Sequence, residues 1–342
     1  MQQFPLVSVS GTSYEMGYQH GEQAAELIER YLRWIEKLNQ RERDDLGQRA
    51  RAFLPFIEKL NPALIQEVRG LSAGAQIPFE HALLCQTRGE AAQAPIAEDC
   101  TAFAFRGEAT TQGQTLAGQN QDLPPEFSDL GIVLHIKPTD HRPRAITFTF
   151  AGQLGYMGMN ARGVAHFANG LSDYTWQLGL PHYPLKRTLL EKNNMAECLD
   201  ILHQHRTCSA ANMVVCDGDG EIADIEIRPE GIALYADEHP DCRLHTNHYI
   251  TDQFAPHETH GTTDSVARLQ RIRGLVRENW GKIDVECIKS ILGDHEGDPG
   301  AICRHGAGGT HSICGYIAEP ARGIFHVRRG HGCLGTWTAY EV

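Results

Sequence analysis

The sequence lacks several features that define whole classes of protein. It has no block of basic residues, and its net charge is −12 over 342 residues, so the positive footprint that nucleic-acid binding needs is missing. No run of about 18 apolar residues occurs, and no membrane span is expected. Residues 1–5 carry neither the basic nor the apolar part of a signal peptide. We therefore expect a cytoplasmic protein with no nucleic-acid or membrane partner.

Motifs that hold disulfides or metals are also missing. None of the ten cysteines are spaced Cys-x-x-Cys, so in a reducing compartment most should be free, buried and without a functional role. Eighteen histidines, among them His245, His248, His305 and His311, could suggest a metal. No His-x-x-x-His occurs in a helical context, however, and no carboxylate is placed to complete a zinc triad. We expect no metal, and a metal-dependent amidohydrolase stays an alternative that a chelator would test.

The composition and the spacing of apolar residues predict a sizeable hydrophobic core and a helical N-terminal region. The chain is 41% hydrophobic and 22% charged, as in ordinary globular proteins. Apolar residues recur every three or four positions from 14 to about 39, which predicts a long helix. Further helices are expected over 47–59, from Asn61 as N-cap to about 74, and over 78–86.

After residue 100 the apolar period changes to two, which is typical of strands. Helical patterns return at 185–192, 196–205, 264–280 and 285–292. Helices at one end and between blocks of strands indicate a layered α+β domain. The predicted strands are 101–106, 115–119, 132–137, 145–150, 164–168, 213–216, 221–228, 232–236, 244–248, 312–317, 323–328 and 336–341.

One cysteine stands out by its position. Cys100 begins the first strand of the alternating region, behind the loop-like segment 91–99. A loop that delivers a thiol to the edge of a sheet can place a nucleophile there, although a buried structural cysteine is the commoner case. The polar segments 118–122 and 244–248 each end a strand, and each would also suit an ordinary turn or sheet edge. No spacing selects a histidine partner for Cys100.

Several segments occur in the order found in a known family. The chain resembles the acyl-coenzyme A:6-aminopenicillanic-acid acyltransferases, the isopenicillin-N acyltransferase-like N-terminal-nucleophile hydrolases. The match covers most of the chain, and its specificity comes from motifs that would each be weak alone. The matching motifs are EMGYQHG (15–21), DCT (99–101), GQNQD (118–122), MNARGVA (159–165), HTNH (245–248), DSVARL (264–269) and ICRH (302–305).

This resemblance implies a four-layer αββα sandwich and a precursor that cuts itself before its nucleophilic cysteine. Here the bond would join Asp99 to Cys100. Residues 1–99 would then be a helical small subunit, and residues 100–342 would be the αββα core that begins at the nucleophile. The family often has glycine before its cysteine, where this chain has Asp99, and this leaves open a homologue that binds without maturing.

The resemblance also implies a role for each site residue. Cys100 would be the nucleophile, and its α-amine, freed by the cut and with a pKa near 8, would be its base. Asp122 would orient the amine and thiolate, and Asn247 would stabilise the tetrahedral oxyanion. Asn169 would be a second oxyanion donor, and Arg268 would lower the pKa of the thiol. The alternatives for these last two are a plain turn and a solvated helix residue.

The implied function is acyl transfer at an amide. A small N-acyl amine or N-acyl amino acid would pass its acyl group to Cys100 as a thioester, which water then hydrolyses. Transfer to an amine, with a coenzyme A thioester as acyl donor, is the alternative, and no other cofactor is expected. The expected partners are the small-molecule substrate and the cleaved N-terminal fragment, bound as a heterodimer. A homo-oligomer stays open.

Overall fold

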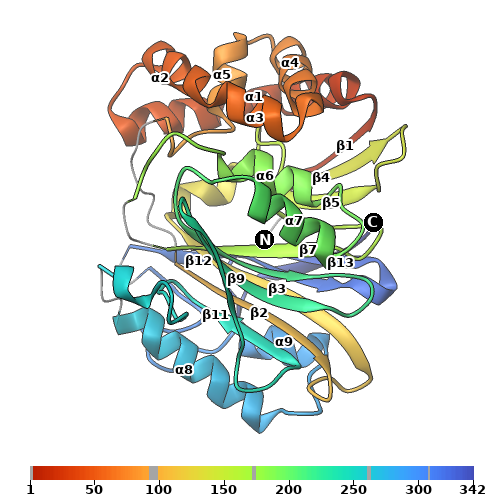
Figure 1. Ribbon diagram of the computed structural model, residues 1–342, viewed down its shortest axis with the longest axis vertical. Coiled ribbons are helices and arrows are strands. Elements are labelled where there is room, and N and C mark those ends of the chain that lie inside the picture. The colour runs from red at the N-terminus through yellow and green to blue at the C-terminus, as the bar shows by residue number, and fades with distance from the viewer. Residues whose placement is uncertain (1–2, 92–98, 172–174, 260–262, 307–308) are drawn as a thin grey trace.

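A computed structural model describes residues 3–91, 99–171, 175–259, 263–306 and 309–342. Two β-sheets lie face to face, and helices cover the outer face of each (Figure 1). The rings of Phe167 and Tyr316, which come from different sheets, stack 6.3 Å apart in the core between them. The layers confirm the predicted αββα sandwich. Over the described ranges, no helix combines the length and the apolar character that crossing a membrane requires.

The first sheet has eight strands in the order β1-β4-β5-β6-β7-β8-β9-β10. β1 and β4 run parallel, and the other neighbours are antiparallel. The sequence patterns missed β6, a short, fully buried strand in which no polar alternation could appear. The strands are β1 (Leu6–Gly11), β4 (Gly131–Pro138), β5 (Ala145–Phe150), β6 (Met157–Asn160), β7 (Ala165–Gly170), β8 (Ala211–Cys216), β9 (Ile222–Arg228) and β10 (Gly231–Tyr235).

The second sheet has six antiparallel strands in the order β11-β2-β3-β12-β13-β14. The motif at 118–122 ends a strand as predicted, since β3 stops at Leu123, but the strand expected over 115–119 is longer than predicted. Asn120 shows why: its buried side chain donates to the carbonyl of Leu292 at 2.9 Å, so a polar residue is satisfied inside the sheet. The strands are β2 (Asp99–Gly107), β3 (Gly113–Leu123), β11 (Cys242–His245), β12 (His311–Glu319), β13 (Ile324–Arg329) and β14 (Thr336–Glu341).

The N-terminal helices cover the first sheet (Figure 1). The first begins with a capping box between Thr12 and Glu15, and Asn61 caps the fourth as predicted. The single helix expected over 47–59 is instead broken, because Pro55 lacks an N–H and clashes with the carbonyl four residues earlier. These helices are α1 (Ser13–Asn39), α2 (Arg43–Ala50), α3 (Leu54–Leu60), α4 (Pro62–Ala75) and α5 (Phe79–Leu84).

The remaining helices complete the outer layers. α8 and α9 cover the second sheet, where Leu269 and Ile288 share a buried cluster with Phe103 of β2. This packing brings α8 alongside the beginning of β2. The helices are α6 (His182–Leu189), α7 (Met195–Gln204), α8 (Thr263–Glu278) and α9 (Val285–Ile291), with 3-10 turns at Arg51–Phe53, Pro125–Asp129, Ala255–His257 and Pro320–Arg322.

The N-terminal segment is an integral part of this fold. It supplies β1 to the first sheet, and α1 packs on α4 backbone to backbone. A Cβ built on Gly17 would lie 1.9 Å from the carbonyl oxygen of Glu67, and one on Gly70 would lie 2.0 Å from that of Tyr14. The close packing of α1 on α4 therefore explains why the motif at 15–21 contains glycines. Whether the chain divides between residues 99 and 100 stays a prediction.

Replacing a glycine by alanine should have opposite effects on stability at the α1–α4 contact and at an open helix position. Gly70→Ala forces two backbones apart, so we expect it to lower the free energy of unfolding by about 1–3 kcal/mol. Gly274→Ala, in α8, meets nothing within 4 Å and should raise it by about 0.5–1 kcal/mol. Urea unfolding of the two variants measures both effects, and equal stabilities would contradict the close packing.

Candidate active site

Cys100 lies near the start of β2, which runs between β11 and β3 (Figure 1). Its side chain is fully buried. Because β2 has a neighbour on each side and α8 across one face, residues distant in sequence reach this single position. Residues 92–98, most of the segment predicted to be a loop, lie outside the described residues.

Two side chains hold the backbone of Cys100. Its amide N–H donates to Oδ1 of Asn247 at 2.7 Å, and Nη1 of Arg268 donates to its carbonyl oxygen at 2.5 Å. Nη2 of Arg268 also donates to Oδ1 of Asn247, at 2.9 Å. Two donors converge on this oxygen, so the amide orientation of Asn247 is determined. Its Nδ2 then donates to the carbonyl of Gly170 at 3.0 Å.

Arg268 is a buried residue of α8. The alternative of a solvated helix position is therefore excluded. Burying a guanidinium is costly unless its donors are paired. Here Nη1 and Nη2 bind Cys100, Asn247 and the Oγ1 of Thr101, the last at 3.2 Å, and the buried Nε has no partner among the described residues. Arg268 thus contacts the backbone beside the thiol, and its predicted effect on the thiol pKa stays a prediction.

A chain of amide side chains leads from the thiol to the facing sheet. Cys100 and Gln121 are cross-strand partners and share one face of the second sheet. Nε2 of Gln121 donates to Sγ of Cys100 at 3.2 Å. Nε2 of Gln119 donates to Oε1 of Gln121 at 3.3 Å and to Oδ1 of Asn169 at 3.2 Å. Asn169 lies within β7, so the turn alternative is excluded.

Asp122 faces the other side of the second sheet, because its cross-strand partner is Asp99 and successive side chains alternate. Its Oδ1 accepts a hydrogen bond from Ser312 at 2.5 Å, and its buried Oδ2 has no partner among the described residues. Burial raises the pKa of Asp122 to about 7, against the lowering effect of Arg268. The structure therefore places Asp122 beside Asp99 and the strand end, on the opposite face from the thiol.

Asp99 is held by two guanidinium groups. Arg304 binds both Asp99 and Asp264, and Arg268 lies 3.6 Å from Oδ1 of Asp99. The hydroxyl of Thr310 donates to Oδ2 of Asp99 at 3.0 Å. The carboxylate before Cys100 is therefore charge-compensated and fixed in position.

The segment that carries Asn247 is anchored from two sides. On one side, Oγ of Ser265 accepts from the amide N–H of Asn247 at 2.7 Å. On the other, His245 lies 3.1 Å from Glu226 in a fully buried ion pair. Burial opposes a charge on this imidazole, but Asp224 and Glu226 outweigh it and raise the pKa of His245. Asn247 is consequently held directly by α8, and its segment is tied to β9 through His245.

The structure places Asn247 and Arg268 on the backbone of Cys100, links Asn169 to its thiol through Gln121 and Gln119, and puts Asp122 beside Asp99 on the opposite face of the sheet. It also adds residues that the sequence reasoning missed. Gln121 and Arg304 lay inside the recognised motifs at 118–122 and 302–305, but no spacing connected either to Cys100. Glu226 and Ser312 carried no signal, since their contacts arise only when strands pair.

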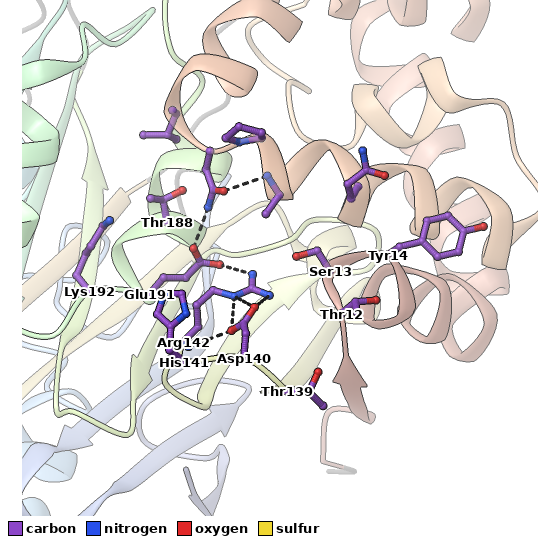
Figure 2. Close-up of a pocket in the computed structure, with 15 residues that line it drawn as sticks. Thr12, Ser13, Tyr14, Thr139, Asp140, His141, Arg142, Thr188, Glu191 and Lys192 are labelled. Atoms are coloured by element: carbon purple, nitrogen blue, oxygen red, sulfur yellow. Dashed lines mark hydrogen bonds and ion pairs between the residues drawn. The ribbon is translucent and has the colours of Figure 1, made fainter.

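A separate surface pocket of about 670 Å³ opens between the starts of α1 and α4 and the loop after β4 (Figure 2). Three charged groups of its lining form one network. Glu191 binds Arg142 at 3.0 Å and Asn61 at 2.8 Å, and Arg142 also binds Asp140 at 2.8 Å. None of the residues around Cys100 line it, so the candidate active site is not in this pocket.

Comparison with known proteins identifies both a family and a fold. The family model described as acyl-coenzyme A:6-aminopenicillanic acid acyl-transferase matches residues 109–330, more than half of the chain. Structures of two variants of the conjugated bile acid hydrolase from Clostridium perfringens align at TM-scores of 0.51 and 0.50, with 11% and 12% identity. Each alignment covers 71% of this chain and 97% of the hydrolase.

A structure of penicillin V acylase from Agrobacterium tumefaciens aligns at a TM-score of 0.47 with 12% identity, over 71% of this chain and 86% of the acylase. The two bile acid hydrolase structures share only 11% and 12% sequence identity with this chain, so their similarity establishes a common fold. The layered αββα fold predicted from the sequence is thereby confirmed.

The raised pKa of Asp122 predicts that stability falls as pH rises. Asp122 would lose its proton near its ordinary value of 3.8 in the unfolded chain and near 7 in the folded one, so the folded state binds more protons between these values. The free energy of unfolding should fall by on the order of 1 kcal/mol per pH unit in this window. Asp122→Asn should remove that slope.

Urea unfolding at several pH values between 4 and 7 would test this, with Cys100→Ala in both chains so that each stays intact. Other titrating groups are common to the two chains and cancel in the difference. Parallel pH profiles would show that Asp122 is ionised throughout.

Proposed function

Because the chain belongs to the acyl-coenzyme A:6-aminopenicillanic acid acyl-transferase family, we propose that it is a self-processing cysteine hydrolase of small N-acyl amines or N-acyl amino acids. One observation carries the proposal. The amide nitrogen, the carbonyl oxygen and the thiol of Cys100 are each held by a different buried polar side chain, those of Asn247, Arg268 and Gln121. A structural cysteine packs as a small apolar residue and needs none of these contacts.

Self-cleavage would begin with attack of the Cys100 thiol on the carbonyl carbon of Asp99. The C–N bond between the two residues breaks, the thiol proton goes to the departing nitrogen, and Asp99 becomes a thioester on Sγ. Water then hydrolyses the thioester to a carboxylate and restores the thiol. Oδ1 of Asn247 already accepts the N–H of Cys100, so the new α-amine would keep this partner.

Asp99 replaces the glycine that is common before the family's cysteine, and its surroundings accommodate it. Arg304 and Arg268 offset its charge, and Thr310 fixes its Oδ2. Held in this way, the carboxylate is kept from repelling a developing oxyanion on its own backbone. This supports self-cleavage over the alternative of a homologue that binds without maturing.

In turnover the α-amine of Cys100 would act as the base, since its pKa near 8 suits proton transfer at neutral pH. It takes the thiol proton, and the thiolate attacks the carbonyl of the N-acyl substrate. The amine product leaves with the proton from the α-ammonium, and water hydrolyses the thioester. The buried Oδ2 of Asp122 would be the acceptor for the α-ammonium, and a cation there would lower the pKa of Asp122.

The oxyanion would be stabilised by the amide groups of Asn247 and Asn169. In the uncut chain both groups donate to backbone carbonyls, Asn247 to Gly170 at 3.0 Å and Asn169 to Thr246 at 2.9 Å. Preorganised amide donors of this kind act best where charge develops in the transition state. For this role, the substrate oxygen must accept hydrogen bonds from these two amide groups, either together with the backbone carbonyl oxygens or in their place.

Transfer to an amine is the second candidate, because the family is described as an acyl-transferase. The thioester on Cys100 is the same in both reactions, and the acceptor decides between them. A coenzyme A thioester could then supply the acyl group. The ratio of free acid to amide, measured with increasing amine acceptor, distinguishes hydrolysis from transfer.

Self-cleavage predicts two fragments that meet between Asp99 and Cys100. Mass spectrometry of the intact protein should find masses for residues 1–99 and 100–342. Cys100→Ala should give one uncut chain without amidase activity, because the attacking sulfur is gone. Cys242→Ala removes another buried strand cysteine, in β11, and should be cut normally. An uncut wild-type chain, or an active Cys100→Ala variant, would overturn the proposal.

The oxyanion role predicts a large kinetic effect for Asn247→Ala. We expect kcat to fall by about 10²–10³-fold on the best substrate found in a screen of N-acyl amides. The rate is normalised to the cut fraction, so that slower self-cleavage is not counted as slower turnover. Asn193→Ala, which removes a surface asparagine paired with Glu197, is the control and should leave kcat unchanged. A loss below about tenfold would argue against the role.

A further inference from the structure

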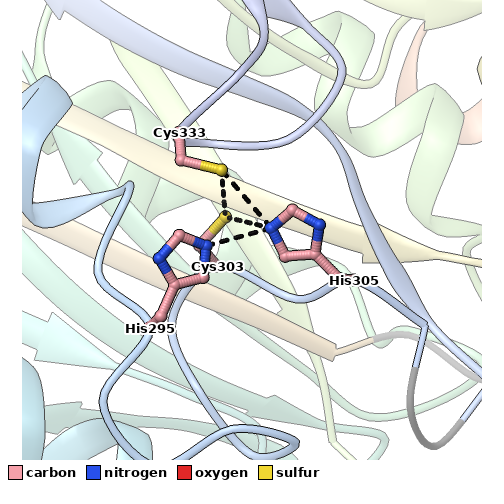
Figure 3. A group of neighbouring side chains, drawn as sticks. All are labelled: His295, Cys303, His305 and Cys333. Atoms are coloured by element: carbon pink, nitrogen blue, oxygen red, sulfur yellow. Dashed lines mark hydrogen bonds between the residues drawn. The ribbon is translucent and has the colours of Figure 1, made fainter.

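Four side chains with metal-binding atoms converge at one end of the second sheet (Figure 3). They come from three separate segments. His295 follows α9, Cys303 and His305 precede β12, and Cys333 lies between β13 and β14. Their Nε2 and Sγ atoms all lie within 4.8 Å of one another. This arrangement was invisible in the sequence, where no two of the four form a recognised zinc motif.

Four of the six distances between these atoms are close to the edges of a zinc tetrahedron, and the other two, from His295 to the two sulfurs, are no longer than 4.8 Å. Zn–S bonds of about 2.3 Å and Zn–N bonds of about 2.05 Å place two sulfurs about 3.8 Å apart, sulfur and nitrogen about 3.6 Å, and two nitrogens about 3.3 Å. The sulfurs of Cys303 and Cys333 are 3.9 Å apart. Nε2 of His305 lies 3.6 Å and 3.4 Å from them and 3.0 Å from Nε2 of His295.

We propose that His295, Cys303, His305 and Cys333 form a structural zinc site. Two thiolates and two imidazoles are a soft donor set that selects zinc over magnesium or calcium, and two thiolates balance the charge of one Zn²⁺. All four tetrahedral positions are supplied by the protein, which is typical of a structural and not a catalytic centre. Cys303 is buried and the other three ligands are exposed, so the ion can enter from solvent.

A neighbouring histidine orients one ligand. The ring of His331 stacks on that of His305 with centroids 4.0 Å apart, and Nδ1 of His331 lies 2.9 Å from the carbonyl oxygen of Arg304. His331 is therefore a positioning residue of the site.

The site would fix the backbone around Arg304. Its ligands Cys303 and His305 flank Arg304, whose guanidinium binds Asp99 and Asp264. Zinc would thus tie the segment before β12 to the β13–β14 connection and to the segment after α9. This role concerns the scaffold and does not depend on the chemistry proposed for Cys100.

Zinc content of the full-length protein tests the proposal. The protein is made without a histidine tag, incubated with zinc and dialysed against metal-free buffer, and its zinc is measured by inductively coupled plasma mass spectrometry. We expect one zinc per chain. Cys333→Ser and His295→Ala should each lose most of it, whereas Cys287→Ser, outside the cluster, should retain it.

Cobalt provides a readout that needs no variant to fold. Co²⁺ bound by the wild-type protein should show the strong visible absorption of a tetrahedral complex together with a thiolate charge-transfer band. Wild-type protein without bound zinc and without these bands would overturn the proposal. A native Cys303–Cys333 disulfide, found by mass spectrometry before reduction, or equal zinc in wild-type and Cys333→Ser protein, would do so too.

Discussion

The hydrogen bond from the amide of Cys100 to Asn247, shared with Arg268, is the constraint on which the candidate site depends. It joins β2 to the segment after β11 and to α8, which are distant in sequence. The hydrogen bonds of Nη1 and Nη2 offset part of the cost of burying this guanidinium, and they hold the Cys100 carbonyl and Asn247 in one geometry. Loss of any member would leave a buried polar group unpaired, which costs about 1–3 kcal/mol or more.

Successive side chains of β2 and β3 point to opposite faces of the sheet, so the residues of the site are divided between these two faces. The thiol of Cys100 and the amides of Gln121 and Asn169 lie between the sheets. Asp122 faces the layer of α8, beside Asp99. The α-amine freed by a cut before Cys100 would lie at the strand end, where both faces can be reached. After the proposed cut, Cys100 would be the first residue of its strand, and its α-amine could reach the carboxylate of Asp122, which the amide of a mid-strand cysteine could not.

Much of the fold could be predicted from local pattern, and the failures have identifiable causes. The long first helix, the cap at Asn61 and most strands follow from periodicity and capping chemistry. The break near Pro55 was missed because apolar spacing continues across it. β6 and the end of β3 were missed because a strand buried on both faces shows neither alternation nor a reliable polar boundary.

The sequence by itself determined the family and the layered fold, because these depend on ordered motifs and on local periodicity, and it singled out Cys100 as the proposed nucleophile. Only the tertiary structure decided which atoms meet. It placed Arg304 on Asp99 and Gln121 on the thiol, and it brought four metal-binding side chains together from three segments. The physical reason is that strand pairing and helix packing bring distant residues into contact, and sequence separation carries no record of those distances.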